Sequence, residues 1–376
     1  MEKFEDIYKN RHQYAKDWKA KTGGKILGYL CTYIPEEIVY AAGALPVRIL
    51  GSHEIEDVTA PYIFPVFCPF CRDTLAQGLK GRYDYLDGIV SADTCMHINQ
   101  TFDNWVLYCG IGRENAFIAN TPANVAGPRA RDYLAKENLE FKKHMEEWTG
   151  KTITNDDLDR GIEIMNRNRR LMKQVYETRK GEKPPITGAE AMLMVTASQF
   201  SDKEEHSNIV EQVLKKELPG RLSDRDPGVR LMIVGSEDDD IEFIRMVESK
   251  GATLVVDDHC TGTRYFWNEV IPGEDRLAAI ANRYIDRTPC PVKDWSERRR
   301  FTQVLKLAQE YKVQGIILMQ QKFCDPHEVD IPPLTVFLKE HNIPTYFLEL
   351  DVTVPLGAFG TRVEAFLETI RGEELF

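Results

Sequence analysis

Short apolar runs that alternate with helix-like segments are the feature that most constrains the fold of this chain. They fall into two series, one before residue 121 and one after residue 228. Each run has strand length, and proline or glycine punctuates the helical segments between them, as at 35–43. Strand–helix–strand alternation predicts parallel sheets, because a parallel neighbour is reached only through a crossover. The predicted strands are 25–31, 46–50, 86–91 and 116–120, then 229–235, 253–256, 315–319 and 345–348.

The stretch between the two series has no strand signal. It is rich in Glu, Lys, Arg and Met at helical spacing, and Pro184 and Pro185 interrupt it. The fold class we predict is therefore α/β, with two flavodoxin- or Rossmann-like parallel-sheet lobes joined by a helical segment. The predicted domains are an N-terminal helix (residues 1–22) with a first α/β domain (1–130), a helical bridge (131–216) and a second α/β domain (217–376).

The two series also resemble one another. Gly88-Ile-Val leads to Cys95 seven residues after the glycine, and Gly315-Ile-Ile leads to Cys324 nine residues after its glycine. In both series a cysteine follows the carboxyl end of an apolar strand. This correspondence predicts a duplicated architecture.

Charge and composition exclude several classes of function. The chain has 376 residues and a net charge of −11, which argues against nucleic acid as a partner, since phosphate binding needs clustered Lys and Arg. The basic run Arg298–Arg300 is predicted to be a solvated helix face, with phosphate contact as the alternative. No apolar stretch approaches the length of a membrane span, and the charged N-terminus is unlike a secretory signal, so we expect a cytoplasmic protein.

The chain has eight cysteines. In the reducing compartment that we expect, cysteines are more often metal ligands or buried residues than disulfide partners. Cys31, Cys95 and Cys324 each follow a predicted strand at the edge where parallel sheets bind ligands. Three widely spaced thiols from two lobes suit a [4Fe–4S] cluster that leaves one iron open. The alternative is that each is an ordinary buried or loop cysteine.

Cys68-Pro-Phe-Cys71 is the one C-x-x-C pair of the sequence. It is a candidate for an alternate cluster ligand, for a redox pair at the start of a helix near Asp73, or for simple packing. A structural zinc site would need a second close pair. Cys109, Cys260 and Cys290 lie in no such pattern and are predicted to be packing residues. A metal site at Asp257-Asp258-His259-Cys260 is the alternative, which is disfavoured because adjacent residues cannot all point at one ion.

Phosphate-binding and hydrolase motifs are absent. The sequence contains no G-x-x-x-x-G-K-[ST], no G-x-G-x-x-G after a strand, no G-x-S-x-G and no H-E-x-x-H. The chain is therefore not expected to hydrolyse ATP through a phosphate loop.

Four segments carry a resemblance to a known family. Residues 28–46 (GYLCTYIPEEIVYAAGALP) resemble the N-terminal signature of 2-hydroxyacyl-CoA dehydratase and benzoyl-CoA reductase subunits, and 321–328 (QKFCDPHE) resemble a later cluster-ligand motif. Gly88-Ile-Val with Cys95 is similar to the second ligand segment, and 256–259 (VDDH) resemble a turn of the second domain. The resemblance covers nearly the whole chain, and its N-terminal signature is most similar to that of the small cluster-binding subunit of benzoyl-CoA reductase.

The resemblance implies a cofactor and partners. It implies one [4Fe–4S] cluster held by Cys31, Cys95 and Cys324, in a cleft between the lobes that also receives an acyl-CoA. It also implies a homologous second cluster-binding subunit, separate ATP-hydrolysing iron–sulfur activator subunits, and ferredoxin as the upstream electron donor.

Acid–base candidates lie close to the proposed ligands. Glu36 and Glu37 follow Cys31, and either could supply a proton; pairing with the positive helix N-terminus is the alternative. His97 and His327 follow Cys95 and Cys324 and could tune the cluster or relay protons, with a plain loop role as the alternative.

Three functions are compatible with these sequence features. The leading one is ATP-driven reduction of benzoyl-CoA or a similar aromatic thioester to a cyclic diene, as in anaerobic aromatic degradation. The second is dehydration of a 2-hydroxyacyl-CoA through a ketyl radical anion. The third is a non-catalytic two-lobed binding protein whose cysteines are merely buried.

Overall fold

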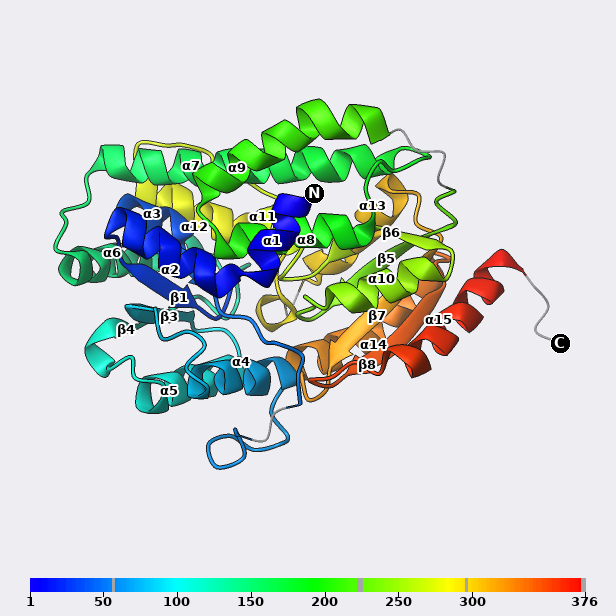
Figure 1. Cartoon of the computed structure of the whole chain (residues 1–376), viewed down its shortest axis with the longest axis horizontal. Helices are drawn as coiled ribbons and strands as arrows, with labels where there is room; N and C mark the ends of the chain where they lie inside the picture. Colours follow the sequence, from blue (N-terminus) through cyan, green and yellow to red (C-terminus); the bar gives the residue numbers. More distant parts are fainter. Residues whose placement is uncertain (56–57, 222–225, 295–296, 373–376) are drawn as a thin grey trace.

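Two four-stranded parallel sheets organise the part of the chain that the structure describes. This computed structural model describes residues 1–55, 58–221, 226–294 and 297–372. The strand orders are β2-β1-β3-β4 and β6-β5-β7-β8, and the two sheets lie in separate lobes (Figure 1). The strands are β1 Ile26–Tyr29, β2 Leu45–Arg48, β3 Gly88–Ala92, β4 Ala116–Ala119, β5 Val229–Gly235, β6 Ala252–Asp258, β7 Gly315–Gln321 and β8 Thr345–Leu350.

Helices connect the strands and cover both sheets (Figure 1). The helices are α1 Glu2–Lys9, α2 Arg11–Thr22, α3 Glu36–Ala41, α4 Pro69–Leu79, α5 Met96–Tyr108, α6 Ala130–Thr149, α7 Asn155–Glu177, α8 Gly188–Phe200, α9 Lys203–Gln212, α10 Ile241–Ser249, α11 Thr263–Phe266, α12 Arg276–Asp286, α13 Arg299–Glu310, α14 Asp325–Glu340 and α15 Leu356–Arg371. The predicted N-terminal helix is in fact two, because the helix breaks at Asn10.

The two sheets have the same topology. In each, the first strand of the series pairs in parallel with the second and the third, and the third pairs with the fourth. Strands β5 and β7 are buried along their whole length, which explains why they read as continuous apolar runs. The predicted α/β class with two parallel-sheet lobes is confirmed, and the predicted duplication matches the shared strand order.

Helices α6 to α9 occupy the region predicted as a bridge. The 23-residue α7 runs alongside α9 across both lobes (Figure 1). Helix α3 of the first lobe packs against α7, while α8 packs against β2 of the first lobe and β6 of the second. Helix α12 follows β6 in sequence but packs on α6, so Ile280 and Ile285 belong to the core of the first lobe. The predicted domain boundaries stay a prediction.

The basic run Arg298–Arg300 is not a solvated face. Arg300 is fully buried, and its Nε lies 2.6 Å from Asp258 while its Nη1 pairs with Asp330. Arg298 contacts the same Asp330 at 2.9 Å. Two buried carboxylates therefore hold this end of α13, a pairing that the sequence run itself does not reveal.

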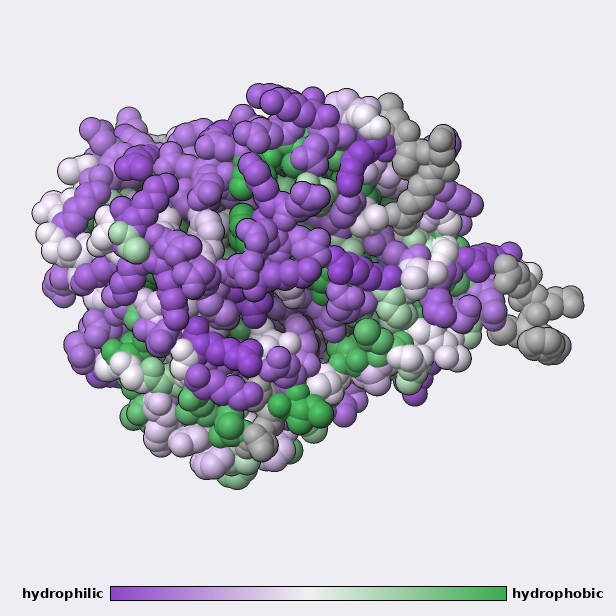
Figure 2. Space-filling model, viewed as in Figure 1, coloured by the Kyte–Doolittle hydropathy of each residue, from purple (hydrophilic) through white to green (hydrophobic). Residues whose placement is uncertain are grey.

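The visible surface is mostly hydrophilic, and its apolar groups gather along the lower part of the view in Figure 2, over both lobes. Within the described residues, no helix combines the length and apolar character that crossing a bilayer requires.

Candidate metal centre

Seven of the eight cysteines line one cavity between the two lobes. The cavity encloses about 750 Å³, counting the open space at its mouth. Cys109 is the exception, since it lies at the C-terminal end of α5. The lining cysteines are Cys31, Cys68, Cys71, Cys95, Cys260, Cys290 and Cys324.

Strand ends place the three cysteines predicted as ligands. Cys31 lies two residues after β1, and Cys95 and Cys324 lie three residues after β3 and β7. Because the carboxyl ends of parallel strands share one edge of a sheet, all three reach the cavity. The structure brings them to one place, and their binding of a cluster stays a prediction.

Three helices begin at cysteines that face this cavity. Cys68 is the N-cap of α4, Cys95 of α5 and Cys324 of α14. The positive end of a helix dipole favours a thiolate, so these positions suit metal-binding sulfur. Hydrogen bonds with Cys324 and Cys71 lower the pKa of the Cys68 thiol well below its usual range.

Cys260 and Cys290 are the cavity cysteines that sequence reasoning missed. Cys260 follows β6 by two residues, the spacing that Cys31 has after β1, and that spacing is the signal that could have found it. Its thiol hydrogen-bonds with Cys290, which lowers the pKa of Cys290. Cys290 follows no strand and precedes only a short 3-10 turn, Pro291–Lys293, so no sequence signal marks it.

The acidic neighbours of Cys260 make other contacts. Asp258 lies 2.6 Å from Arg300 Nε, and Asp257 accepts the backbone N–H of Thr263 at 2.7 Å. His259 lies with Nδ1 2.8 Å from the carbonyl oxygen of Ser236. Of this Asp-Asp-His-Cys run, the cavity is lined by the cysteine alone.

Two histidines that the sequence singled out stand beside the thiols, and their predicted part in tuning a cluster stays a prediction. His97 Nδ1 accepts the backbone N–H of Cys68 at 3.1 Å, so Nε2 carries the proton of the neutral ring. His327 Nδ1 lies 3.3 Å from Cys324 Sγ. Burial lowers the pKa of His327 well below its ordinary value, which keeps that ring neutral.

Glu237 is a further cavity residue that the sequence did not indicate. It follows β5 by two residues, and its carboxylate lies 2.6 Å from Arg48 Nη2 on β2. Burial raises the pKa of Glu237 to about 8, with Arg48 opposing the shift. The acid is therefore protonated for a large fraction of molecules at neutral pH.

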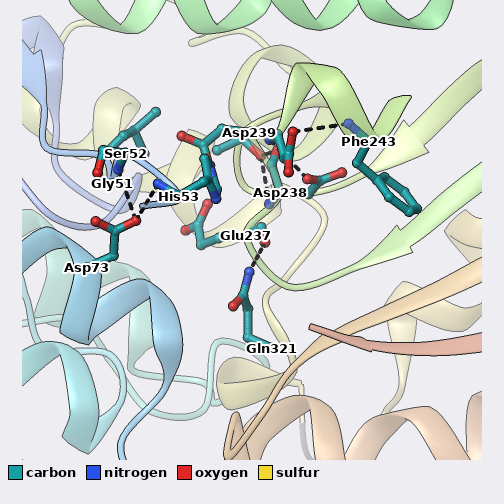
Figure 3. A network of polar contacts seen from close by, with 12 residues as sticks. Gly51, Ser52, His53, Asp73, Glu237, Asp238, Asp239, Phe243 and Gln321 are labelled. Carbon is teal, nitrogen blue, oxygen red and sulfur yellow. Dashed lines mark hydrogen bonds and ion pairs between the residues drawn. The ribbon is translucent and has the colours of Figure 1, made fainter. Parts of the chain in front are cut away.

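A polar network fixes the backbone around Glu237 (Figure 3). Gln321 Nε2 donates to the carbonyl oxygen of Glu237 at 3.0 Å. Asp73 on α4 accepts the backbone N–H groups of Ser52 and His53, and His53 Nε2 lies 2.9 Å from Asp239. The network joins the first lobe to the second next to the cavity.

Glu36 and Glu37 lie elsewhere, in a buried network between α3 and α7. Glu37 lies 2.7 Å from Arg169 Nη1, and Glu36 accepts the Tyr265 hydroxyl at 3.0 Å with Lys203 Nζ at 3.4 Å. The helix that follows Cys31 turns these carboxylates away from the thiols. Their predicted part in proton transfer stays a prediction, and their position favours a role in joining the helices.

The donor set fits a cluster better than a single ion. Among the described residues, no three or more His, Cys, Asp or Glu side chains are arranged to hold one metal ion. An iron–sulfur cluster carries its cysteines on different irons, so its ligands surround a volume instead of meeting at a point. Thiols on several sides of one cavity match that requirement.

Comparison with known proteins decides the family. The family model for the D-component of 2-hydroxyglutaryl-CoA dehydratase matches residues 31–370. This chain belongs to that family. The match spans both lobes and the bridge, and so includes all seven cavity cysteines.

Relatives of this D-component family member are similar over most of their length. The chain is 28% identical to the beta subunit of (R)-phenyllactyl-CoA dehydratase from Clostridium sporogenes, covering 98% of this chain and 97% of the relative. It is 26% identical to a benzoyl-CoA reductase subunit from Thauera aromatica, covering 88% and 86%. It is 25% identical to the beta subunit of (R)-2-hydroxyglutaryl-CoA dehydratase from Acidaminococcus fermentans, covering 98% of both. The predicted family is confirmed, and these relatives are subunits of dehydratases and of a reductase.

Proposed function

We propose that this chain is an iron–sulfur subunit that delivers low-potential electrons to an acyl-CoA thioester. The observation that carries the proposal is the lining of one interlobe cavity by seven thiols in a member of the D-component family. A [4Fe–4S] cluster, when bound, would supply single electrons at low potential. Cys31, Cys95 and Cys324 would hold it, with Cys68 and Cys71 as alternate ligands.

The walls of the cavity suit such a centre. Leu30, Tyr33, Phe70 and Ile98 line it together with the thiols and keep water from much of its surface. The N-termini of α4, α5 and α14 would stabilise the negative charge of thiolates. His97 holds the backbone of Cys68 in place through its Nδ1.

Reduction of an aromatic acyl-CoA to a cyclic diene is the reaction that we propose first. Two aromatic residues, Tyr33 and Phe70, line the cavity. Phe67 packs on the His97 ring at 4.5 Å, and Phe323 is 39% exposed beside Cys324. Aromatic walls favour a flat ring and limit water around an added electron.

Dehydration of a 2-hydroxyacyl-CoA is the second candidate, and Glu237 favours it. Loss of a hydroxyl group needs a proton donor, and a carboxylic acid with a pKa of about 8 can provide that proton at neutral pH. Glu237 lines the cavity, whereas Glu36 and Glu37 lie in the α3–α7 network.

Partners complete the proposal. The chain has no phosphate loop, so separate ATP-hydrolysing iron–sulfur activator subunits would energise the electrons that ferredoxin donates. A homologous second cluster-binding subunit would share the acyl-CoA site. The protein would then work as a heteromer.

A paired assay tests the reaction. The complex would be reconstituted anaerobically with reduced ferredoxin, MgATP and either benzoyl-CoA or a 2-hydroxyacyl-CoA. Diene formation from benzoyl-CoA is the result expected for the reductase. Loss of hydroxyl from the second substrate, with no diene from the first, would assign the dehydratase instead.

A further inference from the structure

An ion pair joins the two lobes at the wall of the cavity. Arg48 is the last residue of β2 in the first lobe, and Glu237 follows β5 in the second lobe. Arg48 is fully buried, and its Nη2 lies 2.6 Å from Oε1 of Glu237. Among the described residues, Glu237 is part of the cavity wall and Arg48 is not. Arg48 can therefore act on a bound substrate only through Glu237.

The ion pair uses one oxygen of the carboxyl group. Arginine and carboxylate side chains frequently pair through two parallel hydrogen bonds. Here, Arg48 Nε and Glu237 Oε2 are both buried, and neither has a hydrogen-bond partner among the described residues. Unpaired buried polar atoms cost stability, so a contact that served only to join the lobes would be expected to use both. The single contact therefore points to a use for the second oxygen.

This contact decides which oxygen of Glu237 carries the proton of the acid. A guanidinium group only donates hydrogen bonds, so Oε1 accepts from Arg48 and the proton of the neutral acid lies on Oε2. Gln321 Nε2 holds the carbonyl oxygen of Glu237 at 3.0 Å and fixes the backbone from which the side chain starts. Oε2 is then the atom that can give a proton.

The guanidinium group of Arg48 is itself held in place. Its central carbon lies 5.7 Å from the ring centre of Tyr29 and 5.9 Å from that of Phe70. Its Nη1 lies 3.4 Å from Oε1 of Gln199 on α8. These contacts keep the cation in one position while the charge of Glu237 changes.

We propose that Arg48 is a positioning residue for proton transfer, which holds Glu237 through Oε1, leaves the proton on Oε2 and pairs with the carboxylate that forms when this proton moves to the substrate. The inference rests on the proposed function and deepens it. Both candidate reactions take up protons: reduction of the ring to a diene adds two protons with two electrons from the activator, and a departing hydroxyl group takes one to leave as water. In each transfer the Oε2–H bond breaks, its electron pair stays on Glu237, and solvent later returns the proton.

The charges around Glu237 give the direction of the expected effect. Burial raises the pKa of Glu237 to about 8, and Arg48 is the strongest of the charges that oppose this. Loss of Arg48 should therefore raise this pKa further and make Glu237 a weaker acid. The other titratable or charged groups that act on Glu237 are Cys31, Asp239, Cys260 and Arg264.

The pH dependence of turnover in the reconstituted anaerobic complex tests the role of Arg48. In Arg48→Met, the decline centred near pH 8 should move up by about 1–3 pH units, and turnover at pH 7 should fall by about 10-fold. Arg48→Lys restores the charge and should return the centre of the decline toward pH 8. Arg169→Met is the matched control, because it removes a buried arginine from a 2.7 Å ion pair with Glu37 in the α3–α7 network and should leave the centre where it is.

Infrared difference spectra follow the same carboxyl group without turnover. The C=O band of the protonated acid, identified by its loss in Glu237→Gln, should disappear near pH 8 in the unaltered chain and at higher pH in Arg48→Met. A band that titrates at the same pH in both chains would overturn the positioning role.

The outcomes separate this inference from the proposed function. An unmoved pH profile in folded Arg48→Met, or a shift that Arg169→Met reproduces, would overturn the role of Arg48 and leave the iron–sulfur function standing. An unaltered complex that turns over neither substrate would remove the proposed function, while the infrared titration still decides on Arg48. If Arg48→Met fails to fold, the double variant with Glu237→Gln leaves no buried charge of this pair unpaired. Its turnover should equal that of Glu237→Gln alone, and a further loss would contradict the proposal.

Discussion

The two lobes share one topology but differ at the end of their first strand. The third strand of each sheet is followed after three residues by a cysteine that begins a helix, Cys95 in the first lobe and Cys324 in the second. Two residues after the first strand, however, the first lobe has Cys31 and the second has Glu237. The comparison teaches that the repeated topology brings thiols together, while this departure from it places an acid beside them.

Equal effects of replacing Cys95 and Cys324 would sharpen this comparison most. Each replacement by Ser should remove at least half of the bound iron and abolish turnover, because both residues lie at equivalent strand ends. Iron analysis and the acyl-CoA assay measure the two effects. A full iron content in either variant would remove that residue from the ligand set and break the equivalence of the lobes.

Breaking the buried α3–α7 network should lower the stability of the fold and leave iron binding unchanged. Glu37→Gln leaves the buried Arg169 without its ion partner and should lower the free energy of unfolding by about 3–5 kcal/mol. Chemical denaturation measures that loss. Iron per folded chain should stay unchanged, and a selective loss of iron from folded Glu37→Gln would return Glu37 to the site.

Replacing Glu237 should impair proton transfer during turnover and leave iron binding unchanged. Burial raises its pKa to about 8, so the protonated, donating form predominates below that pH and is lost as the pH rises through it. Glu237→Gln should lower turnover by about 100-fold and remove the decline centred near pH 8.

The iron content of Glu237→Gln should remain that of the unaltered chain. Glu349→Gln is the matched control, because Glu349 is exposed on β8 and should change neither rate nor pH profile. An unaltered pH profile in Glu237→Gln would exclude this carboxyl as the proton donor.

Sequence reasoning predicted the sheets and three of the cavity cysteines, because strands buried on both faces are visible as apolar runs and Cys31, Cys95 and Cys324 follow such runs. It missed Cys290, which reaches the cavity because α12 packs on α6 and the Cys290 backbone N–H then meets the Tyr33 hydroxyl of the first lobe. It missed Glu237, since burial between two lobes and not local sequence raises the pKa of that acid. It placed Glu36 and Glu37 near the thiols by adjacency to Cys31, but the direction of α3 decides where they point.

The smallest effect concerns the ion pair that ties the lobes beside the cavity (Figure 3). Burial disfavours the charged ring of His53, but Asp239 outweighs this and raises the pKa of His53 to about 10 from an ordinary value of 6.5. The stabilisation is fully present below pH 6.5 and is lost as the pH rises through about 10.

His53→Gln should therefore lower the melting temperature by a few degrees at pH 6 and make little difference above pH 10. Thermal unfolding of both chains at the two pH values measures this. An equal decrease at both values would show that the contact stabilises through packing and not through charge.

The central claim is that the interlobe cavity binds an iron–sulfur centre through its thiols. The most direct measurement is iron and acid-labile sulfide on the unaltered, anaerobically purified chain, with electron paramagnetic resonance after reduction. The account predicts iron and sulfide in about equal amounts and a signal typical of a reduced four-iron centre. A correctly folded chain that is colourless, free of iron and unable to take up iron and sulfide would contradict it.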